Sequence, residues 1–239
     1  MDIAQSDPSA AVPAVIEARD LTFEVAGPAG RVNILKGVDM RVMPGEAVGI
    51  VGPSGSGKTS LLMLLAGLDK PTTGSLTVAG RALGGMNEDA LARFRREEVG
   101  IVFQSFHLVP TMTALENVAM PLEFAGDDTA FIRAEAALKA VGLGHRVHHY
   151  PGQLSGGEQQ RVAVARAFVA LPSLILADEP TGNLDRATGQ QIMELLFGLR
   201  ETYGTTLVLI THDPALAARC DRQFHMEDGL LTERDSVPV

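Results

Sequence analysis

Residues 48–62 restrict what this chain can fold into more than any other stretch. They read VGIVGPSGSGKTSLL, a short apolar run typical of a buried strand, then a turn rich in glycine and serine, then an apolar helix that begins at Lys58. The turn fits the pattern G-x-x-x-x-G-K-[ST], with Gly52 and Gly57 as its outer glycines. In this arrangement backbone N–H groups and the positive end of a helix dipole converge on an anion. The stretch therefore predicts that the chain binds a nucleoside triphosphate.

The residues of this loop have distinct expected contacts. Lys58 supplies a mobile charge for the β- and γ-phosphates, the Thr59 hydroxyl is placed to ligate Mg²⁺, and Ser60 is placed to reach the α-phosphate. A flexible linker rich in glycine and serine is the alternative, but the strand before the turn and the helix after it disfavour that alternative. The residues expected to bind the nucleotide are Gly52, Pro53, Ser54, Gly55, Ser56, Gly57, Lys58, Thr59 and Ser60.

The composition narrows the possible functions. A chain of 239 residues that is 46% hydrophobic can bury a sizeable core and suits one domain. The net charge of −9 argues against a general electrostatic attraction to nucleic acid or anionic lipid. The longest apolar run, residues 61–66, is far shorter than the roughly 20 residues of a membrane-spanning helix. The start of the chain lacks the features of a signal peptide, and the single cysteine, Cys220, excludes an internal disulfide. A cytoplasmic location is expected, with membrane association only through a protein partner.

Short apolar segments alternate with helical patterns along the chain, which indicates a mainly parallel sheet covered on both faces. Before this core, alternating apolar and polar residues predict an antiparallel β unit. Residues from about 105 to 165 are mostly helical and predict an inserted helical subdomain. Residues 1–14 lack periodicity and are expected to form a disordered tail, which leaves 15–235 as the nucleotide-binding domain. Strands are expected at 15–25, 32–42, 48–51, 75–83, 101–104, 174–178 and 205–213, with a terminal hairpin at 223–233.

Two adjacent carboxylates follow the apolar run of residues 174–177. Asp178, at the end of this run, is the natural partner of Mg²⁺ through water, and Glu179 can orient and deprotonate the attacking water. In a chain without a phosphate-binding loop, a solvated loop would be the better explanation of this pair. Gln104 is the polar last residue of the strand predicted at 101–104 and sits where that strand emerges into the site. His212 comes where a sensor of the γ-phosphate is expected, although a lone histidine would count little.

The octapeptide LSGGEQQR, residues 154–161, resembles the signature sequence of the ATP-binding cassette (ABC) ATPases. A serine and two glycines at the start of a helix form a second anion-binding terminus, in which Ser155, Gly156 and Gly157 present N–H groups and a hydroxyl. The resemblance implies that this terminus faces the nucleotide of a second copy of the chain. Two ATP molecules would then be enclosed in a head-to-tail dimer.

Other motifs are similar to the same family in order and spacing, over residues 15–235. Gln104 resembles the Q-loop glutamine, residues 183–185 the D-loop, and His212 the switch histidine. The adenine platform departs from the family pattern, because Val25 occupies the position of the usual aromatic residue and Phe23 precedes it by two residues. The resemblance implies that the catalytic residues are Lys58, Gln104, Glu179 and His212, that the Mg²⁺ ligands are Thr59, Gln104 and Asp178, and that Val25, Ser155, Gly156, Gly157 and Asp185 contact ATP.

Residues 103–122 and 178–189 resemble the branch of the family that includes the ATPase subunits of the lipoprotein-releasing and MacB-type systems. This implies an ABC ATPase that uses ATP and Mg²⁺ and drives a separate permease subunit with a large extracytoplasmic domain, peripherally on the cytoplasmic side of the inner membrane. The apolar segment after Gln104, with Leu108 and Val109, is expected to bind a short helix of that permease.

Two other functions stay open. A soluble ABC ATPase of DNA maintenance is disfavoured because only about 100 residues separate Gly52 from Leu154, which leaves no room for the long insertions of those families. Nucleic acid is therefore not an expected partner. In the second alternative, ATP binding only holds a membrane complex together and turnover is incidental. The presence of Glu179 and His212 disfavours that role.

Overall fold

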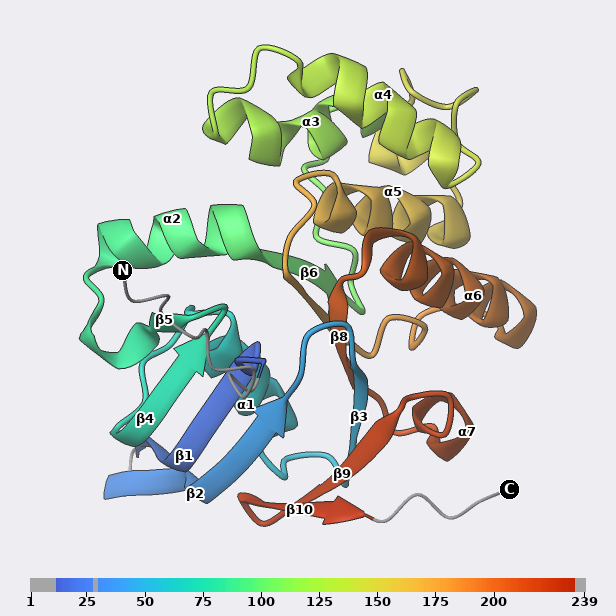
Figure 1. Cartoon of the computed structure of the whole chain (residues 1–239). Coiled ribbons are helices and arrows are strands. Elements are labelled where there is room, and N and C mark those ends of the chain that lie inside the picture. The colour runs from blue at the N-terminus through green and yellow to red at the C-terminus, as the bar shows by residue number, and fades with distance from the viewer. Residues whose placement is uncertain (1–11, 28–29, 235–239) are drawn as a thin grey trace, which may run out of the picture.

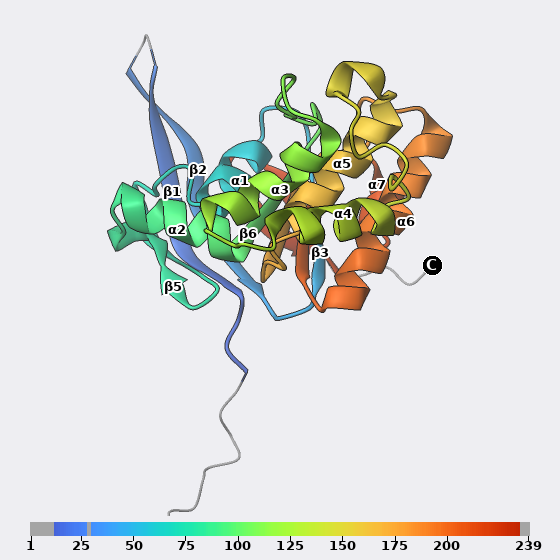
Figure 2. The ribbon, with the colours of Figure 1, turned by 90° about the horizontal axis from the view of Figure 1, so that it is seen from above.

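The computed structural model describes residues 12–27 and 30–234. These residues fold into two β-sheets and a group of helices (Figure 1). Most of the predicted tail, residues 1–11, lies outside the described residues. In the first sheet β1 (Ile16–Gly27) pairs antiparallel with both β2 (Gly30–Val42) and β4 (Thr73–Val78), and β5 (Arg81–Ala82) follows β4. This sheet is the antiparallel unit that the alternating pattern predicts. Seen from above, β1 and β2 project from the rest of the molecule (Figure 2).

One predicted strand is wrong in its extent. Residues 75–83 were expected to form a single strand, but the chain reverses at Ala79 and Gly80, both of which have left-handed backbone angles (φ 47° and 73°). Such angles suit a tight hairpin turn and end a strand. The result is the short β4–β5 hairpin, followed by a 3₁₀ helix (Leu83–Gly85).

The second sheet has the order β10-β9-β3-β8-β7-β6 within the described residues. Its strands β3 (Ala47–Val51), β6 (Val99–Phe103), β7 (Leu174–Asp178), β8 (Thr206–Ile210) and β9 (Arg222–Glu227) are parallel, and β10 (Leu230–Arg234) runs antiparallel to β9. The carboxyl ends of β3, β6, β7 and β8 therefore meet at one edge. This confirms the mainly parallel core and the terminal hairpin.

Successive residues of β7 explain its continuous apolar run. Leu174 and Leu176 face a cluster that includes α1 and the antiparallel sheet, whereas Ile175 and Ala177 face a cluster formed with α5 and α6. Because both faces of the strand are buried, both need apolar side chains. The helices are α1 (Lys58–Leu65), α2 (Glu88–Glu98), α3 (Ala114–Phe124), α4 (Ala130–Ala140), α5 (Gly156–Phe168), α6 (Arg186–Tyr203) and α7 (Pro214–Ala217).

Helices α3, α4 and α5 enclose a third apolar cluster of their own and form the helical subdomain (Figures 1 and 2). The loop between β6 and α3 is held by Asn117, which is 0% exposed. Its amide accepts from the Val109 N–H (2.8 Å) and donates to the Val109, Met112 and Thr113 carbonyls. The subdomain is thus fixed to the chain that follows Gln104. Within the described residues, the helices are all too short or too polar to cross a bilayer.

Candidate active site

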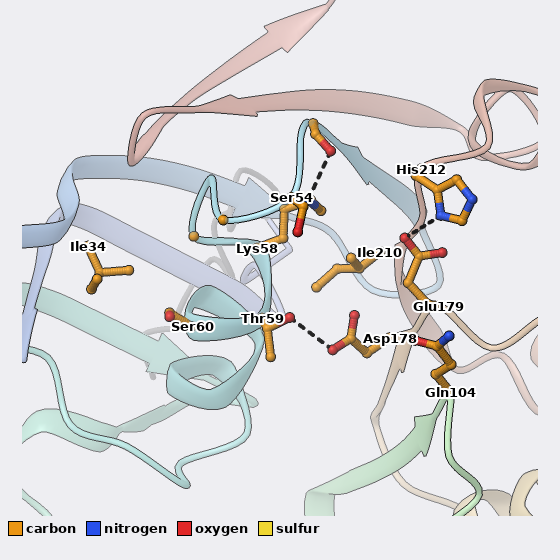
Figure 3. Close-up of a pocket in the computed structure, with 13 residues that line it drawn as sticks. Ile34, Ser54, Lys58, Thr59, Ser60, Gln104, Asp178, Glu179, Ile210 and His212 are labelled. Atoms are coloured by element: carbon orange, nitrogen blue, oxygen red, sulfur yellow. Dashed lines mark hydrogen bonds and ion pairs between the residues drawn. The ribbon is translucent and has the colours of Figure 1, made fainter. Parts of the chain in front are cut away.

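A cavity of about 520 Å³ opens at the carboxyl ends of β3, β6, β7 and β8 (Figure 3). This is where ligands bind in open parallel sheets, because the loops that leave the strands diverge there. Residues more than a hundred positions apart in the chain meet in this space. It is lined by Ile34, Gly52, Ser54, Gly55, Gly57, Lys58, Thr59, Ser60, Gln104, Asp178, Glu179, Ile210 and His212.

The phosphate-binding loop occupies one wall of the cavity and leads into α1, which begins at Lys58. A side chain at Gly52 would collide with the Met226 carbonyl on β9, so the close approach of these two backbones requires glycine. Farther along the loop, the Ser56 carbonyl accepts from the N–H of Gly229 in the β9–β10 turn (3.0 Å). Ser56 itself is buried, and together with Pro53 it does not line the cavity. The loop is therefore held in place through its backbone.

The Lys58 ammonium lies over the loop and donates to the Gly52 and Pro53 carbonyls (2.9 and 2.8 Å). Burial lowers the pKa of this ammonium, while the nearby Glu179 and Asp178 carboxylates oppose the shift. A partly desolvated cation beside unsatisfied backbone N–H groups is suited to a polyanion such as a triphosphate.

The expected metal ligands meet across the cavity, with Thr59 on α1 and Asp178 and Gln104 at the ends of β7 and β6. Thr59 Oγ1 donates to Asp178 Oδ2 (3.1 Å), and Gln104 lines the same cavity. Burial raises the pKa of Asp178, Thr59 lowers it, and the neighbouring Glu179 raises it further. A hydroxyl, a carboxylate and an amide oxygen are the hard ligands that Mg²⁺ prefers. Residues 12–27 and 30–234 contain no cluster of three or more His, Cys, Asp or Glu side chains that could hold a metal ion. The site therefore suits an ion that takes its other ligands from phosphate and water.

The two adjacent carboxylates have different neighbours (Figure 3). Asp178 faces Thr59, whereas Oε1 of Glu179 lies 2.8 Å from Nδ1 of His212. Glu179 has a left-handed backbone (φ 47°), and its N–H donates to the Ile210 carbonyl at the end of β8 (2.9 Å). A positive φ is unusual for glutamate and marks local strain. This conformation turns Glu179 toward the rim, where His212 is 76% exposed.

Gln104, at the edge of the cavity, bonds to the loop before α6. Its Nε2 donates to Asn183 Oδ1 (3.1 Å), and the Asn183 amide donates back to the Gln104 carbonyl (3.0 Å). This reciprocal pair joins the loop after β6 to the loop after β7. The same β6 loop is also held by Arg166 of α5, which donates to the Phe106 and His107 carbonyls (2.9 and 2.8 Å). Sequence analysis missed Arg166, because its partners are backbone atoms about 60 positions away.

Several predicted nucleotide contacts lie outside this cavity. Ser155 caps the start of α5, where its Oγ accepts from the Glu158 N–H (3.3 Å), and Asp185 caps α6. Gly156 and Gly157 form the first residues of α5. None of these four residues lines the cavity of the phosphate loop.

Val25 also lies away from the cavity. It is 39% exposed, and Phe23 packs against the main core. A register irregularity between Phe23 and Glu24 interrupts the alternation of β1. The side chain that the antiparallel sheet contributes to the cavity is instead Ile34 of β2. Sequence analysis missed Ile34, since only the strand pairing places β2 beside the phosphate loop.

These features define a class of protein: an ATPase with a P-loop after β3, a carboxylate pair at the end of β7 and a separate serine-glycine helix terminus. The ABC transporter family model matches residues 35–182 of the chain. The chain belongs to the ABC transporter family and is an ATP-binding, ATP-hydrolysing subunit within it.

The chain is similar to two kinds of curated relative. It is 50% identical over 221 residues to the uncharacterized ABC transporter ATP-binding protein YbbA of Escherichia coli strain K12, covering 92% of this chain and 97% of that protein. It is 52% identical over 207 residues to the lipoprotein-releasing system ATP-binding protein LolD of Bordetella avium, covering 86% of this chain and 90% of LolD. The predicted branch of the family is therefore confirmed.

Solved structures give the same result for the fold. The dimeric post-hydrolysis state of the ATP-binding cassette MJ0796, bound to ADP and Pi, has a TM-score of 0.86 and 39% sequence identity to this chain. The match covers 94% of this chain and 100% of that one. A second dimeric structure of MJ0796 has a TM-score of 0.85. MJ0796 is thus dimeric in both structures, and one of them holds ADP and Pi.

The contact at Gly52 yields the first prediction. Gly52→Ala is expected to weaken ATP binding by about tenfold or more, because the added methyl group would push the loop away from β9. Titration calorimetry with ATP measures the dissociation constant. Gly152→Ala is the matched control, since a methyl group at that exposed glycine meets no other atom within 4 Å. An unchanged dissociation constant for Gly52→Ala would show that the loop binds phosphate without this contact.

Proposed function

We propose that two copies of this chain form a head-to-tail dimer that encloses two ATP molecules and drives a membrane permease. The observation that carries the proposal is the separation of two anion-binding sites within one chain. The loop before Lys58 lines the cavity, whereas the Ser155–Gly157 terminus lies on the helical subdomain and does not line it. A second copy would complete each site, in keeping with the dimeric cassettes of similar fold.

The residues of the cavity have separate roles in the proposed reaction. Lys58 and the loop N–H groups hold the phosphates, and Thr59, Asp178 and Gln104 would hold Mg²⁺, which neutralises phosphate charge when bound. Glu179 accepts the proton of the attacking water, which Gln104 helps to orient. His212 contacts the Glu179 carboxylate and keeps it at the rim, beside the position of the γ-phosphate. We propose that Asp185, which caps α6, faces the second copy.

The role of Glu179 gives a direct test. Glu179→Gln preserves shape and hydrogen bonding but removes the base, so turnover should fall by about 10² or more while ATP still binds. Phosphate release and ATP binding by the purified chain are measured in parallel. Glu201→Gln, an exposed substitution of the same kind on α6, should leave both unchanged. Turnover of Glu179→Gln within a factor of two of the parent would exclude Glu179 as the base.

Mixed dimers test whether each site is shared between two copies. Lys58→Ala damages the phosphate loop, and Ser155→Arg places a bulky cation in the opposite half-site. In a dimer of one Lys58→Ala chain and one Ser155→Arg chain, both defects fall in one site and the other site stays intact. We expect about one trapped ATP per mixed dimer and almost none in either homodimer. If the mixed dimer traps none, the sites are not built across the interface.

The permease is proposed to bind in a groove of about 530 Å³ between the core and the helical subdomain. Leu108 and Val109, the docking residues expected from the sequence, do not line this groove. Leu108 packs against the core of the helical subdomain, and the Val109 backbone is held by Asn117. The groove is lined by Ala92, Arg93, Arg95, Arg96, Val99, Gly100, Ile101, Met120, Pro121, Phe124, Arg166, Ala167 and Ala170.

The chemistry of the groove fits a short amphipathic helix with acidic residues. Apolar side chains form most of its surface, with Phe124 71% exposed, and four of its lining residues are arginines. Arg166 connects this groove to the catalytic loop, because it also holds the Phe106 and His107 carbonyls just after Gln104. A helix bound here would therefore move with the loop that carries Gln104. We infer that this chain works at the cytoplasmic side of the inner membrane, held there by a permease that has a large extracytoplasmic domain. The similarity to the ATP-binding protein of a lipoprotein-releasing system supports a permease partner.

Charge substitution tests the groove. Phe124→Asp should abolish co-purification with the co-expressed permease, because a carboxylate would replace an apolar contact and repel acidic residues of the bound helix. ATP binding by the isolated chain should be unchanged. Ile132→Asp on α4 is the matched control, since Ile132 is 72% exposed but does not line the groove. If the complex survives Phe124→Asp and is lost in Ile132→Asp, the permease binds α4 and not the groove.

A further inference from the structure

Gln160 is a fully buried polar residue of α5 that the roles described so far do not include. Its side chain is 0% exposed. The amide nitrogen donates to the Pro180 carbonyl (2.6 Å) and to the Phe103 carbonyl (3.3 Å). Pro180 directly follows Glu179, and Phe103 directly precedes Gln104. One side chain therefore contacts the backbone next to both residues proposed to act on the attacking water.

These bonds lie where the pairing of β6 with β7 ends. Phe103 and Asp178 are the last partners in the register of the two strands. Beyond this pair, the β6–β7 hydrogen bonds no longer set the distance between the segment that carries Gln104 and the segment that carries Glu179. The Gln160 amide joins the carbonyl of Phe103, the last paired residue of β6, to the carbonyl of Pro180, two residues past the end of β7. It thereby takes over the function of the missing backbone hydrogen bonds.

The orientation of the amide is fixed by its partners. Both are carbonyl oxygens, which accept hydrogen bonds, so the nitrogen must face them and Oε1 must point away. Among the described residues no donor reaches Oε1, which is buried. An unpartnered buried oxygen opposes folding, and filling the space with an apolar side chain would avoid it. Packing alone therefore does not explain an amide at this position.

We propose that Gln160 is a positioning residue for hydrolysis, which sets the separation of Gln104 and Glu179 and ties both to α5. The inference rests on the roles proposed above for those two residues. Because α5 begins with the Ser155–Gly157 terminus, a shift of this terminus on the partner's nucleotide would reach the chain's own catalytic loops through Gln160. The side chain does not contact the phosphate loop, so it should affect turnover and not ATP affinity.

Gln160→Met removes the amide at nearly constant size. We expect kcat of the full chain to fall at least tenfold, with KM for ATP and the ATP dissociation constant each within threefold of the parent. Gln191→Met is the matched control. It removes the hydrogen bond that Gln191 accepts from Arg161 of α5, at a position that contacts neither the Gln104 loop nor the Glu179 loop. A kcat within a factor of two of the parent, or a rise in KM with unchanged kcat, would overturn the proposal.

A double-mutant cycle separates positioning from a general structural effect. If Gln160 acts by placing Gln104 and Glu179, Gln160→Met should cost less than threefold in kcat when Gln104→Ala is already present. If the two residues act independently, the losses of kcat from the two substitutions would multiply. A full tenfold loss of kcat on adding Gln160→Met to the Gln104→Ala variant would therefore overturn the proposal. Thermal unfolding of each variant shows whether activity is compared between equally folded proteins.

A shorter amide provides a second variant if Gln160→Met does not fold. Gln160→Asn keeps the polar group but withdraws it from both carbonyls, so it should give the same loss of kcat without a change in ATP affinity. Normal kcat in Gln160→Asn would overturn the proposal. The parent and Glu179→Gln are assayed alongside. If Glu179→Gln turns over normally, the proposed base is wrong, whereas a normal Gln160→Met beside an inactive Glu179→Gln rejects only the positioning role.

Discussion

The backbone contact between the phosphate loop and the C-terminal hairpin is the constraint on which the rest of the structure depends. Gly52 lies against the Met226 carbonyl, and Gly229 in the β9–β10 turn donates to the Ser56 carbonyl. The Gly229 carbonyl in turn accepts from the Lys36 N–H of β2 (2.9 Å). One turn therefore joins the core sheet, the loop and the antiparallel sheet. The loop N–H groups are ordered before a nucleotide binds, which lowers the entropy cost of binding.

Helix α5 has a comparable role for the helical subdomain. Its first turn carries the proposed second anion-binding terminus. Farther along the helix, Gln160 donates to the carbonyls of Phe103 and Pro180, and Arg166 donates to two carbonyls of the loop after β6. The subdomain cannot rotate without moving these loops or breaking the bonds. Nucleotide at the dimer interface and a permease in the groove would thus both act on the hydrolysis site through a single rigid element.

The sequence predicted those parts of the fold that depend on neighbouring residues. The run at 174–178 became β7 without a shift, because a strand buried on both faces requires apolar residues at successive positions. The phosphate loop was also predictable, since its strand, glycines and lysine are contiguous and the motif specifies their conformation. The strand predicted at 75–83 was too long because the left-handed turn at Ala79 and Gly80 does not interrupt the apolar pattern.

Local sequence patterns were thus enough to predict the class of fold, the phosphate loop and the identity of the two carboxylates. The folded chain was needed to show that Asp178 faces Thr59 while Glu179 turns to His212, and that Ile34, not Val25, reaches the cavity. The physical reason is that side-chain direction at the end of a strand depends on the partners that hold the backbone there. Those partners, such as the Ile210 carbonyl that fixes Glu179, come from segments distant in the chain, and no local pattern records them.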